Sequence, residues 1–367
     1  MADRQTAPSS NVVGSMTAGT SAASATPAHP DLSLIVPCYN EAGNVGAIYR
    51  EAFGVFEDAG ISLELVLVDD GSSDGTMEAL RGLVAHDQSR LVRAIGFTRN
   101  FGKESAMYAG MQEARGRFVG FIDADLQQDP AVALEMYRYL LDHPDCDMVA
   151  AYQDERRESP AMRAAKRCFY RVFNAASDEI DIPADASDFR VFKREVADAL
   201  LSMPEYFRFS KGLFAWVGFH VHTMPYTVRD RGEGTSAWTL RKLVSYAMTG
   251  VLSFTTWPLR IAKWIGFLAS MGAMLYLLYV LLIDYLINGI DIPGYPTLVC
   301  LILLIGGIQM FLLGIIGEYL GRDYLENKRR PIYLARERLA SRAEYEGAGA
   351  DAAGPGEGRL DGDGAHR

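Results

Sequence analysis

Two long apolar blocks near the C-terminal end constrain this chain most. Residues 264–287 and 297–320 each run for about 24 positions, and the first holds one acidic residue, Asp284, near its far end. A helix of about 20 apolar residues crosses the hydrocarbon core of a bilayer. Apolar side chains occupy all sides of both blocks rather than one stripe, which disfavours two buried core helices. We therefore predict two transmembrane helices, 264–287 and 297–320.

Basic residues around these blocks predict their orientation. The connecting segment NGIDIPGYP has no lysine or arginine, whereas basic residues precede the first block and follow the second: Arg241, Lys242, Arg260, Lys263, Arg322, Lys328, Arg329 and Arg330. Loops rich in lysine and arginine stay in the cytoplasm. We expect an integral protein of the cytoplasmic membrane with both termini and the preceding domain in the cytoplasm.

Residues 239–263 precede the first block. Their apolar residues Leu240, Leu243, Val244, Ala247 and Val251 recur at helical spacing with basic residues nearby. This pattern predicts juxtamembrane interfacial helices, although spacing alone equally allows a core helix.

The two ends of the chain have polar, low-complexity composition. Residues 1–30 are rich in Ala, Ser and Thr without a continuous apolar stretch, which predicts a disordered leader rather than a signal peptide. Residues 321–367 are expected to form a cytoplasmic tail that is disordered after about residue 342.

Charge and cysteine usage exclude two classes of function. The net charge of -10, without a basic face along the chain, argues against nucleic acid as a partner. The four cysteines lack the spacing of a zinc site or a disulfide framework, so we expect reduced, mostly buried thiols: Cys38, Cys146, Cys168 and Cys300.

Residues 31–238 have the pattern of an α/β domain. Short apolar runs, LSLIVP, LELVLVDD, RLVRAIGF and RFVGFIDAD, alternate with helix-length stretches, which predicts a mostly parallel sheet covered on both faces. A helix over 131–142 and a strand over 147–151 should follow. In such sheets, ligands bind beyond the carboxyl ends of the strands.

The first two predicted strands end in residues suited to a nucleoside. The first ends in PCYNE, with Pro37, Tyr39 and Glu41, and the second ends in Asp69 and Asp70 followed by Gly71. Carboxylates at a tight turn can accept hydrogen bonds from a base or a ribose. The alternative is that DDGSSDGT provides only turn and helix-cap residues.

The stretch FVGFIDADLQQDP carries three acidic residues at the end of a buried strand. In an extended chain the side chains of Asp123, Asp125 and Gln127 would leave on the same side. Two carboxylates and an amide oxygen suit Mg²⁺ or Mn²⁺, and such a cation would relieve their mutual repulsion. Asp129, just before Pro130, is expected to cap the following helix instead.

These motifs together resemble a known family. VPCYNE, VDDGSSDGT, FIDADLQQDP, DFRVFKREV and RGEGTS, in this order before two apolar blocks, resemble an inverting family 2 glycosyltransferase of the polyprenyl-phosphate glycosyltransferase type. This type includes bactoprenol glucosyltransferases and dolichol-phosphate mannosyltransferase, and the match runs over about residues 32–334.

The resemblance implies a GT-A, Rossmann-like nucleotide-sugar-binding domain with a divalent cation, Mg²⁺ or Mn²⁺. The implied nucleotide-sugar-binding residues are Pro37, Tyr39, Glu41, Asp69, Asp70, Lys103 and Asp123. The implied metal ligands are Asp123, Asp125 and Gln127.

Asp188, Arg190 and Arg231 are the implied catalytic residues. Asp188 would orient the acceptor phosphate or act as a base, unless it merely pairs with Arg190. Arginines hold phosphate oxygens bidentately, and further candidates are Arg167, Arg171 and Arg229, although Arg163, Arg167 and Arg171 could also form one solvated helix face. Relatives carry GxSK where this chain has Ala237, so Arg241 or Lys242 would have to replace that lysine.

The expected reaction transfers a hexose, with inversion and with a metal ion, from a nucleotide sugar to a polyprenyl phosphate such as undecaprenyl phosphate. Glucose from UDP-glucose is favoured, and a GDP-mannose-dependent mannosyltransferase is the alternative. A processive polysaccharide synthase is disfavoured because the sequence lacks QxxRW, and a non-enzymatic nucleotide sensor is disfavoured by the intact acid cluster. The expected partners are the nucleotide sugar, the lipid and the membrane, with a homo-oligomer left open.

Overall fold

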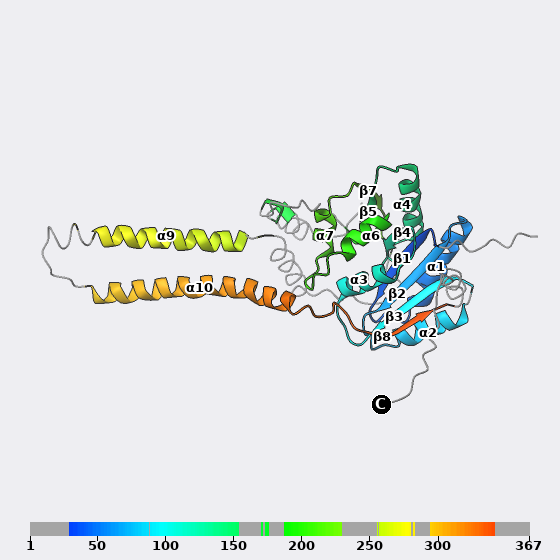
Figure 1. Cartoon of the computed structure of the whole chain (residues 1–367), viewed down its shortest axis with the longest axis horizontal. Coiled ribbons are helices and arrows are strands. Elements are labelled where there is room, and N and C mark those ends of the chain that lie inside the picture. Colours follow the sequence, from blue (N-terminus) through cyan, green and yellow to red (C-terminus); the bar gives the residue numbers. More distant parts are fainter. Residues whose placement is uncertain are drawn as a thin grey trace, which may run out of the picture.

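The computed structural model describes residues 29–87, 89–153, 170–171, 173–175, 187–229, 255, 257–279, 282 and 294–341. In this part of the chain, eight strands form one sheet with helices on both faces (Figure 1). The strands are β1 (Leu32–Cys38), β2 (Leu63–Asp69), β3 (Leu91–Phe97), β4 (Phe118–Phe121), β5 (Met148–Gln153), β6 (Arg190–Lys193), β7 (Val221–Tyr226) and β8 (Ala335–Ala340). The helices are α1 (Val45–Asp58), α2 (Thr76–His86), α3 (Lys103–Glu113), α4 (Pro130–Asp142), α6 (Arg194–Leu201), α7 (Ser210–Trp216), α9 (Trp257–Tyr279) and α10 (Tyr295–Asn327).

The strand order explains why the acidic motifs meet. The sheet runs β7-β5-β6-β4-β1-β2-β3-β8, and β4, β1, β2 and β3 are parallel neighbours. The antiparallel pairings of β6 with β4 and of β8 with β3 make the sheet mixed. The carboxyl ends of β1, β2 and β4, where the three predicted motifs begin, therefore lie side by side at one edge.

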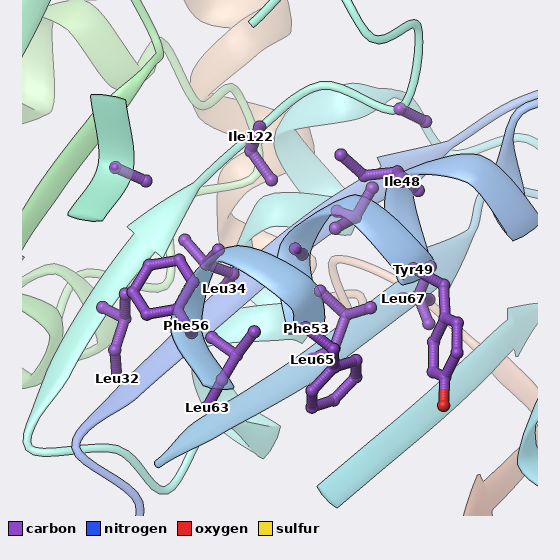
Figure 2. Close-up of a cluster of buried hydrophobic side chains, with 14 of the residues drawn as sticks. Leu32, Leu34, Ile48, Tyr49, Phe53, Phe56, Leu63, Leu65, Leu67 and Ile122 are labelled. Carbon is purple, nitrogen blue, oxygen red and sulfur yellow. The ribbon is translucent and has the colours of Figure 1, made fainter. Parts of the chain in front are cut away.

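One face of the sheet packs on α1, α2 and α4. Figure 2 shows α1 lying across β1 and β2, with Ile48, Phe53 and Phe56 against Leu34 and Leu65. These side chains are at most 3% exposed. Alternate residues of the same strands point to opposite faces, so the predicted near-continuous apolar strands fill both layers of the core.

The other face packs on α3, α6 and α7. Ile35, Val66 and Val119 point to this side and are fully buried, and Phe214 of α7 packs edge-on against Phe192 of β6 at a centroid distance of 5.3 Å. Helices on both faces hold the sheet rigid, and the loops at its carboxyl edge are thereby fixed in position.

Helices α9 and α10 lie side by side and extend away from the sheet domain (Figure 1). Their apolar side chains are open: Met274 is 66% exposed, Met310 71% and Phe311 62%. This exposure rules out buried core helices for the described part of both blocks. Within the described residues, one segment, Leu304–Asn327, is long and apolar enough to cross a membrane.

The boundaries of both helices differ from the prediction. α9 begins at Trp257 rather than 264, because Pro258 is tolerated in the first turn of a helix and the residues after it continue the helix. α10 has 33 residues instead of 24 and spans about 50 Å, which is longer than the hydrocarbon core of a bilayer. The rest of the predicted interfacial segment, residues 239–256 except Thr255, lies outside the described residues, as do 1–28 and 342–367.

The first part of the segment predicted as a tail, residues 321–367, contains the end of α10 and the strand β8. β8 pairs antiparallel with β3, from Arg93 opposite Ala340 to Phe97 opposite Ala335. Ser341 continues the contact, since its hydroxyl donates to the Arg90 carbonyl at 2.6 Å. The chain thus returns from α10 to complete the edge of the sheet.

Among the cysteines, Cys38 is buried, as predicted, and Cys146 is partly buried, and both are free thiols. Burial, and then the carboxylates of Glu41 and Asp69, raise the pKa of the Cys38 thiol well above its usual value. Cys168 and the side chain of Cys300 lie outside the described residues.

Candidate active site

The loops after β1 and β2 are joined by hydrogen bonds. The Asn40 amide donates to the Ser72 hydroxyl at 2.9 Å, and the Ser73 amide donates to Asn40 Oδ1 at 3.0 Å. Asn40 has φ 57, a left-handed conformation that asparagine tolerates better than most residues. The predicted nucleoside residue Tyr39 is 47% exposed beside this junction, so its ring is open to a ligand.

Glu41 and Pro37 lie on either side of Tyr39. The Glu41 amide donates to Thr76 Oγ1 at 2.9 Å, and its carboxylate accepts from Asn44 Nδ2 at 2.6 Å. Pro37 lies within β1 opposite Val68 of β2. A role for these three residues in binding a nucleoside stays a prediction.

Asp70 is 3% exposed and holds the loop between β3 and α3. Its carboxylate accepts from the Phe101 amide at 2.6 Å and from the Gly102 amide at 2.9 Å. Burial raises the pKa of Asp70 to about 6, although these two amides act in the opposite direction. These contacts join Asp70 to a loop 31 and 32 residues further along the chain rather than to its own turn, and its contact with a nucleoside stays a prediction.

Gly71 brings the two loops together. It has φ +67, and a Cβ placed there would lie 2.3 Å from the carbonyl carbon of Arg99 and 2.6 Å from the Asn100 nitrogen. Only glycine allows this approach. Asp69, also 3% exposed, accepts hydrogen bonds from the amide and the hydroxyl of Ser72, which closes the turn.

The segment after β4 is a turn, so the predicted extended arrangement of Asp123 and Asp125 is wrong. Ala124 and Asp125 form the turn, Leu126 has φ 62, and the Gln127 amide donates to Asp125 Oδ1 at 3.2 Å. Short polar side chains compete for backbone groups in this way and bend the chain.

The turn nevertheless gathers the predicted ligands. Asp123, Asp125 and Gln127 line one cavity of about 240 Å³, whose other lining residues are Lys103, Gln128, Gln153, Ser187, Asp188, Lys211 and Tyr226. Asp123 is fixed by Gln128, whose Nε2 donates to Asp123 Oδ2 at 3.0 Å and whose Oε1 accepts from the Asp123 amide at 2.8 Å.

Lys103 bridges two acidic residues of the cavity. Its Nζ lies 2.6 Å from Asp123 Oδ1 and 3.3 Å from Asp188 Oδ2. Burial would lower the pKa of the Lys103 ammonium, but the charges of Asp123 and Asp188 outweigh it and raise the pKa. A lysine expected to reach a nucleotide is thus a cation inside the acid cluster.

Asp188 enters the cavity from the segment before β6. Burial alone would raise its pKa, but the charges of Lys103, Lys211 and Arg190 lower it to about 2. Asp188 is therefore ionised at neutral pH. Its ion pair is with Lys103 rather than with Arg190, the partner that the sequence suggested.

Arg190 is only 4% exposed and lies behind the cavity wall. Its guanidinium stacks on the ring of Phe214 at 3.9 Å, and its Nη2 donates to the Ser187 carbonyl at 2.5 Å. It is not among the lining residues, so direct contact with a phosphate stays a prediction.

The two remaining candidate arginines that the structure describes, Arg171 and Arg229, are not among the residues that line the cavity. Arg229 forms ion pairs with Asp129 and, at 2.9 Å, with Glu51, and therefore ties the N-terminus of α4 to α1. Arg171 is exposed. Arg231, Arg163, Arg167, Ala237, Arg241 and Lys242 lie outside the described residues.

Asp129 is confirmed as the cap of α4. Its Oδ1 accepts from the Ala131 amide at 2.9 Å, and Pro130 is the first residue of the helix. This hydrogen bond satisfies an amide that has no partner inside the helix.

The cavity fits a divalent cation. Within the described residues, no group of three or more His, Cys, Asp and Glu side chains is arranged to hold a metal. Mg²⁺ does not need a group of three such side chains. It is typically bound by one or two carboxylates and completes its coordination shell with water and phosphate oxygens. Asp123 and Asp125, with Gln127, supply such a set of ligands. The ammonium of Lys103 lies at hydrogen-bonding distance from Asp123, so this carboxylate already pairs with a positive charge.

Some of the residues that line the cavity were not predicted from the sequence. Lys211, in the first turn of α7, and Tyr226, at the end of β7, reach the cavity from the second half of the domain. Tyr226 OH accepts from Gln153 Nε2 at 3.3 Å. The pair Lys211–Gly212 in the first turn of α7 was the only signal for Lys211, and a single lysine next to a glycine does not specify a site.

Comparisons with known proteins identify relatives of both the sheet domain and the hairpin. Residues 33–201 match Glycosyl transferase family 2, and residues 257–322 match the GtrB C-terminal hairpin. A prophage bactoprenol glucosyl transferase homolog of Escherichia coli K12 is 36% identical over 308 residues, which cover 83% of this chain and 98% of that protein. The bactoprenol glucosyl transferase of Shigella phage SfV has the same identity and the same coverage.

An uncharacterized glycosyltransferase of Synechocystis, sll0501, is 36% identical over 84% of this chain and 95% of its own length. The crystal structure of glucosyl-3-phosphoglycerate synthase from Mycobacterium tuberculosis is more distant, at 18% identity over 62% of this chain and 80% of that one, with a TM-score of 0.43. The relatives of similar length show that this chain, with its GT-A-like mixed α/β sheet, is a glycosyltransferase of family 2 that carries a GtrB-type C-terminal hairpin.

Proposed function

We propose that this enzyme transfers a hexose from a nucleotide sugar to a polyprenyl phosphate at the cytoplasmic face of a membrane, and that the sugar is inverted at C1. The observation that carries the proposal is one cavity with three carboxylates and two lysines at the carboxyl edge of the sheet, in a chain that also carries the hairpin. Relatives named bactoprenol glucosyl transferase, which align over both parts, support a lipid-linked acceptor.

The reaction joins an oxygen of the acceptor phosphate to C1 of the sugar and breaks the bond between C1 and the diphosphate. A phosphate monoester is already anionic at neutral pH, so no proton has to be removed by a strong base. A carboxyl group with a pKa of about 2 is a weak base, and Asp188 has such a pKa. We therefore assign Asp188 to positioning: it holds Lys103 between itself and Asp123.

Catalysis then depends on charge and orientation at the diphosphate. Asp123, Asp125 and Gln127 would hold Mg²⁺ or Mn²⁺, which neutralises negative charge on the leaving diphosphate when bound. The two lysines of the lining supply fixed positive charge close to the reacting groups. A nucleoside would lie at the neighbouring ends of β1 and β2 and the loops that follow them, which carry Pro37, Tyr39, Glu41, Asp69 and Asp70.

Glucose from UDP-glucose is the donor we favour. The support is that relatives whose length this chain matches are named bactoprenol glucosyl transferases. GDP-mannose is the alternative. A processive synthase is disfavoured because the sequence lacks QxxRW.

We further propose that the hairpin spans the membrane with two helices. The open apolar side chains of α9 and α10 support this, because exposed apolar surface of this extent marks contact with lipid or protein. Basic residues at Arg260, Lys263 and Lys328–Arg330 flank the apolar parts on the side of the sheet domain, which would place that domain in the cytoplasm.

The test is product formation. Membranes that contain the full chain are incubated with labelled UDP-glucose, GDP-mannose or UDP-N-acetylhexosamine, with undecaprenyl phosphate, and with Mg²⁺, Mn²⁺ or a chelator. We expect a labelled lipid-linked monosaccharide from UDP-glucose that disappears with the chelator. The absence of a lipid-linked sugar from every donor would overturn the proposal, and a long polymer would favour the synthase instead.

A further inference from the structure

We propose that Lys211 binds the phosphate group of the lipid acceptor. This inference rests on the proposed function, because it assigns one residue to the acceptor side of the same cavity. Lys211 lines the cavity, and its charge is one of those that lower the pKa of Asp188.

The charges in the cavity indicate that the acceptor phosphate needs a positively charged side chain. Asp123, Asp125 and Asp188 oppose Lys103 and Lys211, so the lining has a formal charge of -1. A divalent cation on the Asp123 side would make it +1, but that cation would be shared with the donor diphosphate. An acceptor phosphate therefore needs a positive group of its own.

Lys103 is already engaged. Its ammonium lies at 2.6 and 3.3 Å from two carboxylate oxygens, which neutralise most of its charge. Lys211 has no hydrogen bond or ion pair of its own among the described residues, and it acts on Asp188 only through its charge. Of the two lining cations, Lys211 is the one whose ammonium remains available for a phosphate oxygen.

A contact between the first turns of α3 and α7 holds the two helices together at the positions of Lys103 and Lys211. The amide of Ser210 donates to both carboxylate oxygens of Glu104 at 3.1 Å, and the Ser210 hydroxyl donates to the same carboxylate. Glu104 follows Lys103 in α3, and Ser210 precedes Lys211 in α7. The Glu104–Ser210 contact thus joins the two helices at the positions that carry both lysines.

The acceptor would approach from this side. Figure 1 shows α7 on the side of the sheet domain that faces the hairpin. The segment before α7 touches α10: the Tyr206 amide donates to Glu326 at 3.0 Å, and Arg322 lies 4.9 Å from the ring centroid of Phe207. A phosphate carried by a membrane lipid next to α10 would therefore approach the cavity from the side of α7, which carries Lys211.

The experiment compares Lys211→Gln and Lys211→Arg with the wild-type full chain in detergent or vesicles. We expect Lys211→Gln to raise the KM for undecaprenyl phosphate roughly 10- to 100-fold, because it removes one charged hydrogen bond. The KM for the nucleotide sugar should stay within about twofold, because the donor side keeps its contacts. Lys211→Arg should restore most of the acceptor affinity, since arginine also binds phosphate.

The matched control is Arg138→Gln on the exposed side of α4, which removes one positive charge away from the cavity. It should leave both KM values unchanged. Binding of undecaprenyl phosphate to the full chain without donor, followed by tryptophan fluorescence, gives a second readout that does not depend on turnover. If Lys211→Gln does not fold, Lys211→Ala and Lys211→Arg are compared in the same binding assay.

Two results would overturn the inference: an unchanged acceptor KM with unchanged lipid binding, or a raised KM for the nucleotide sugar alone, which would assign Lys211 to the donor. Failure of the proposed function is a different result, since the wild-type chain itself would then form no lipid-linked sugar.

Discussion

Replacing Gly71 by alanine tests whether the approach of two loops holds the site together. The new Cβ would lie 2.3 Å from the Arg99 carbonyl carbon, so the loop between β3 and α3 must move. That movement breaks the hydrogen bonds of Asp70 with the amides of Phe101 and Gly102, each worth about 1.5 to 3 kcal/mol because the acceptor is charged.

Gly60→Ala is the matched control. Gly60 has φ +68, against +67 at Gly71, but a Cβ there meets nothing within 4 Å. Both variants should lose roughly 1 to 2 kcal/mol for alanine in the left-handed region. Gly71→Ala should lose at least about 3 kcal/mol more, through the two broken hydrogen bonds.

The assay is urea denaturation of the full chain in detergent, together with turnover. Displacement of the loop also moves Lys103, the next residue after Gly102, so Gly71→Ala should reduce turnover while Gly60→Ala should not. Equal losses of unfolding free energy in the two variants would refute the reasoning, because the backbone conformation alone would then explain both.

Three further predictions concern the metal side, the buried acid and the last strand. Asp125→Ala should abolish turnover and weaken Mn²⁺ binding, measured by electron paramagnetic resonance, while the thermal midpoint of unfolding is retained. The pKa of Asp70 is about 6 in the folded chain, against an ordinary 3.8, so the folded state binds this proton more tightly than the unfolded state. The stability that comes from this difference is fully present below about pH 4 and is lost as the pH rises through 6. Between pH 5 and 7 the wild-type chain should therefore lose more unfolding free energy than Asp70→Asn, and equal slopes in denaturation series would contradict this. A stop after Leu334 removes β8 and should lower the thermal midpoint and expose the β3 edge to aggregation, whereas a stop after residue 342 should have neither effect.

The elements that sequence predicted well are those with a strong local pattern. The apolar strands before Cys38, Asp69 and Ile122 needed no tertiary information, because runs covered on both faces are uniformly apolar. The cap at Asp129 followed from Asp-Pro spacing, and the position of the acidic motifs followed from the carboxyl-edge rule for parallel strands.

The features that sequence missed depend on contacts between distant segments. ARERLA in β8 has little apolar character and becomes a strand because β3 offers it an unpaired edge. Asp70 looked like a ligand because its two amide partners lie 31 and 32 residues further along the chain. The turn at Asp125 also overrides the alternation that an extended chain would have.

The return of the chain to β8 limits how far the sheet domain can move from the hairpin. Seven residues, 328–334, join the end of α10 to β8, which allows roughly 25 Å at full extension. With the hairpin in a bilayer, the cavity would remain at a nearly constant height above the lipid surface. The acceptor would then be found by lateral diffusion in two dimensions, and the rate should follow the mole fraction of polyprenyl phosphate in the bilayer rather than its bulk concentration.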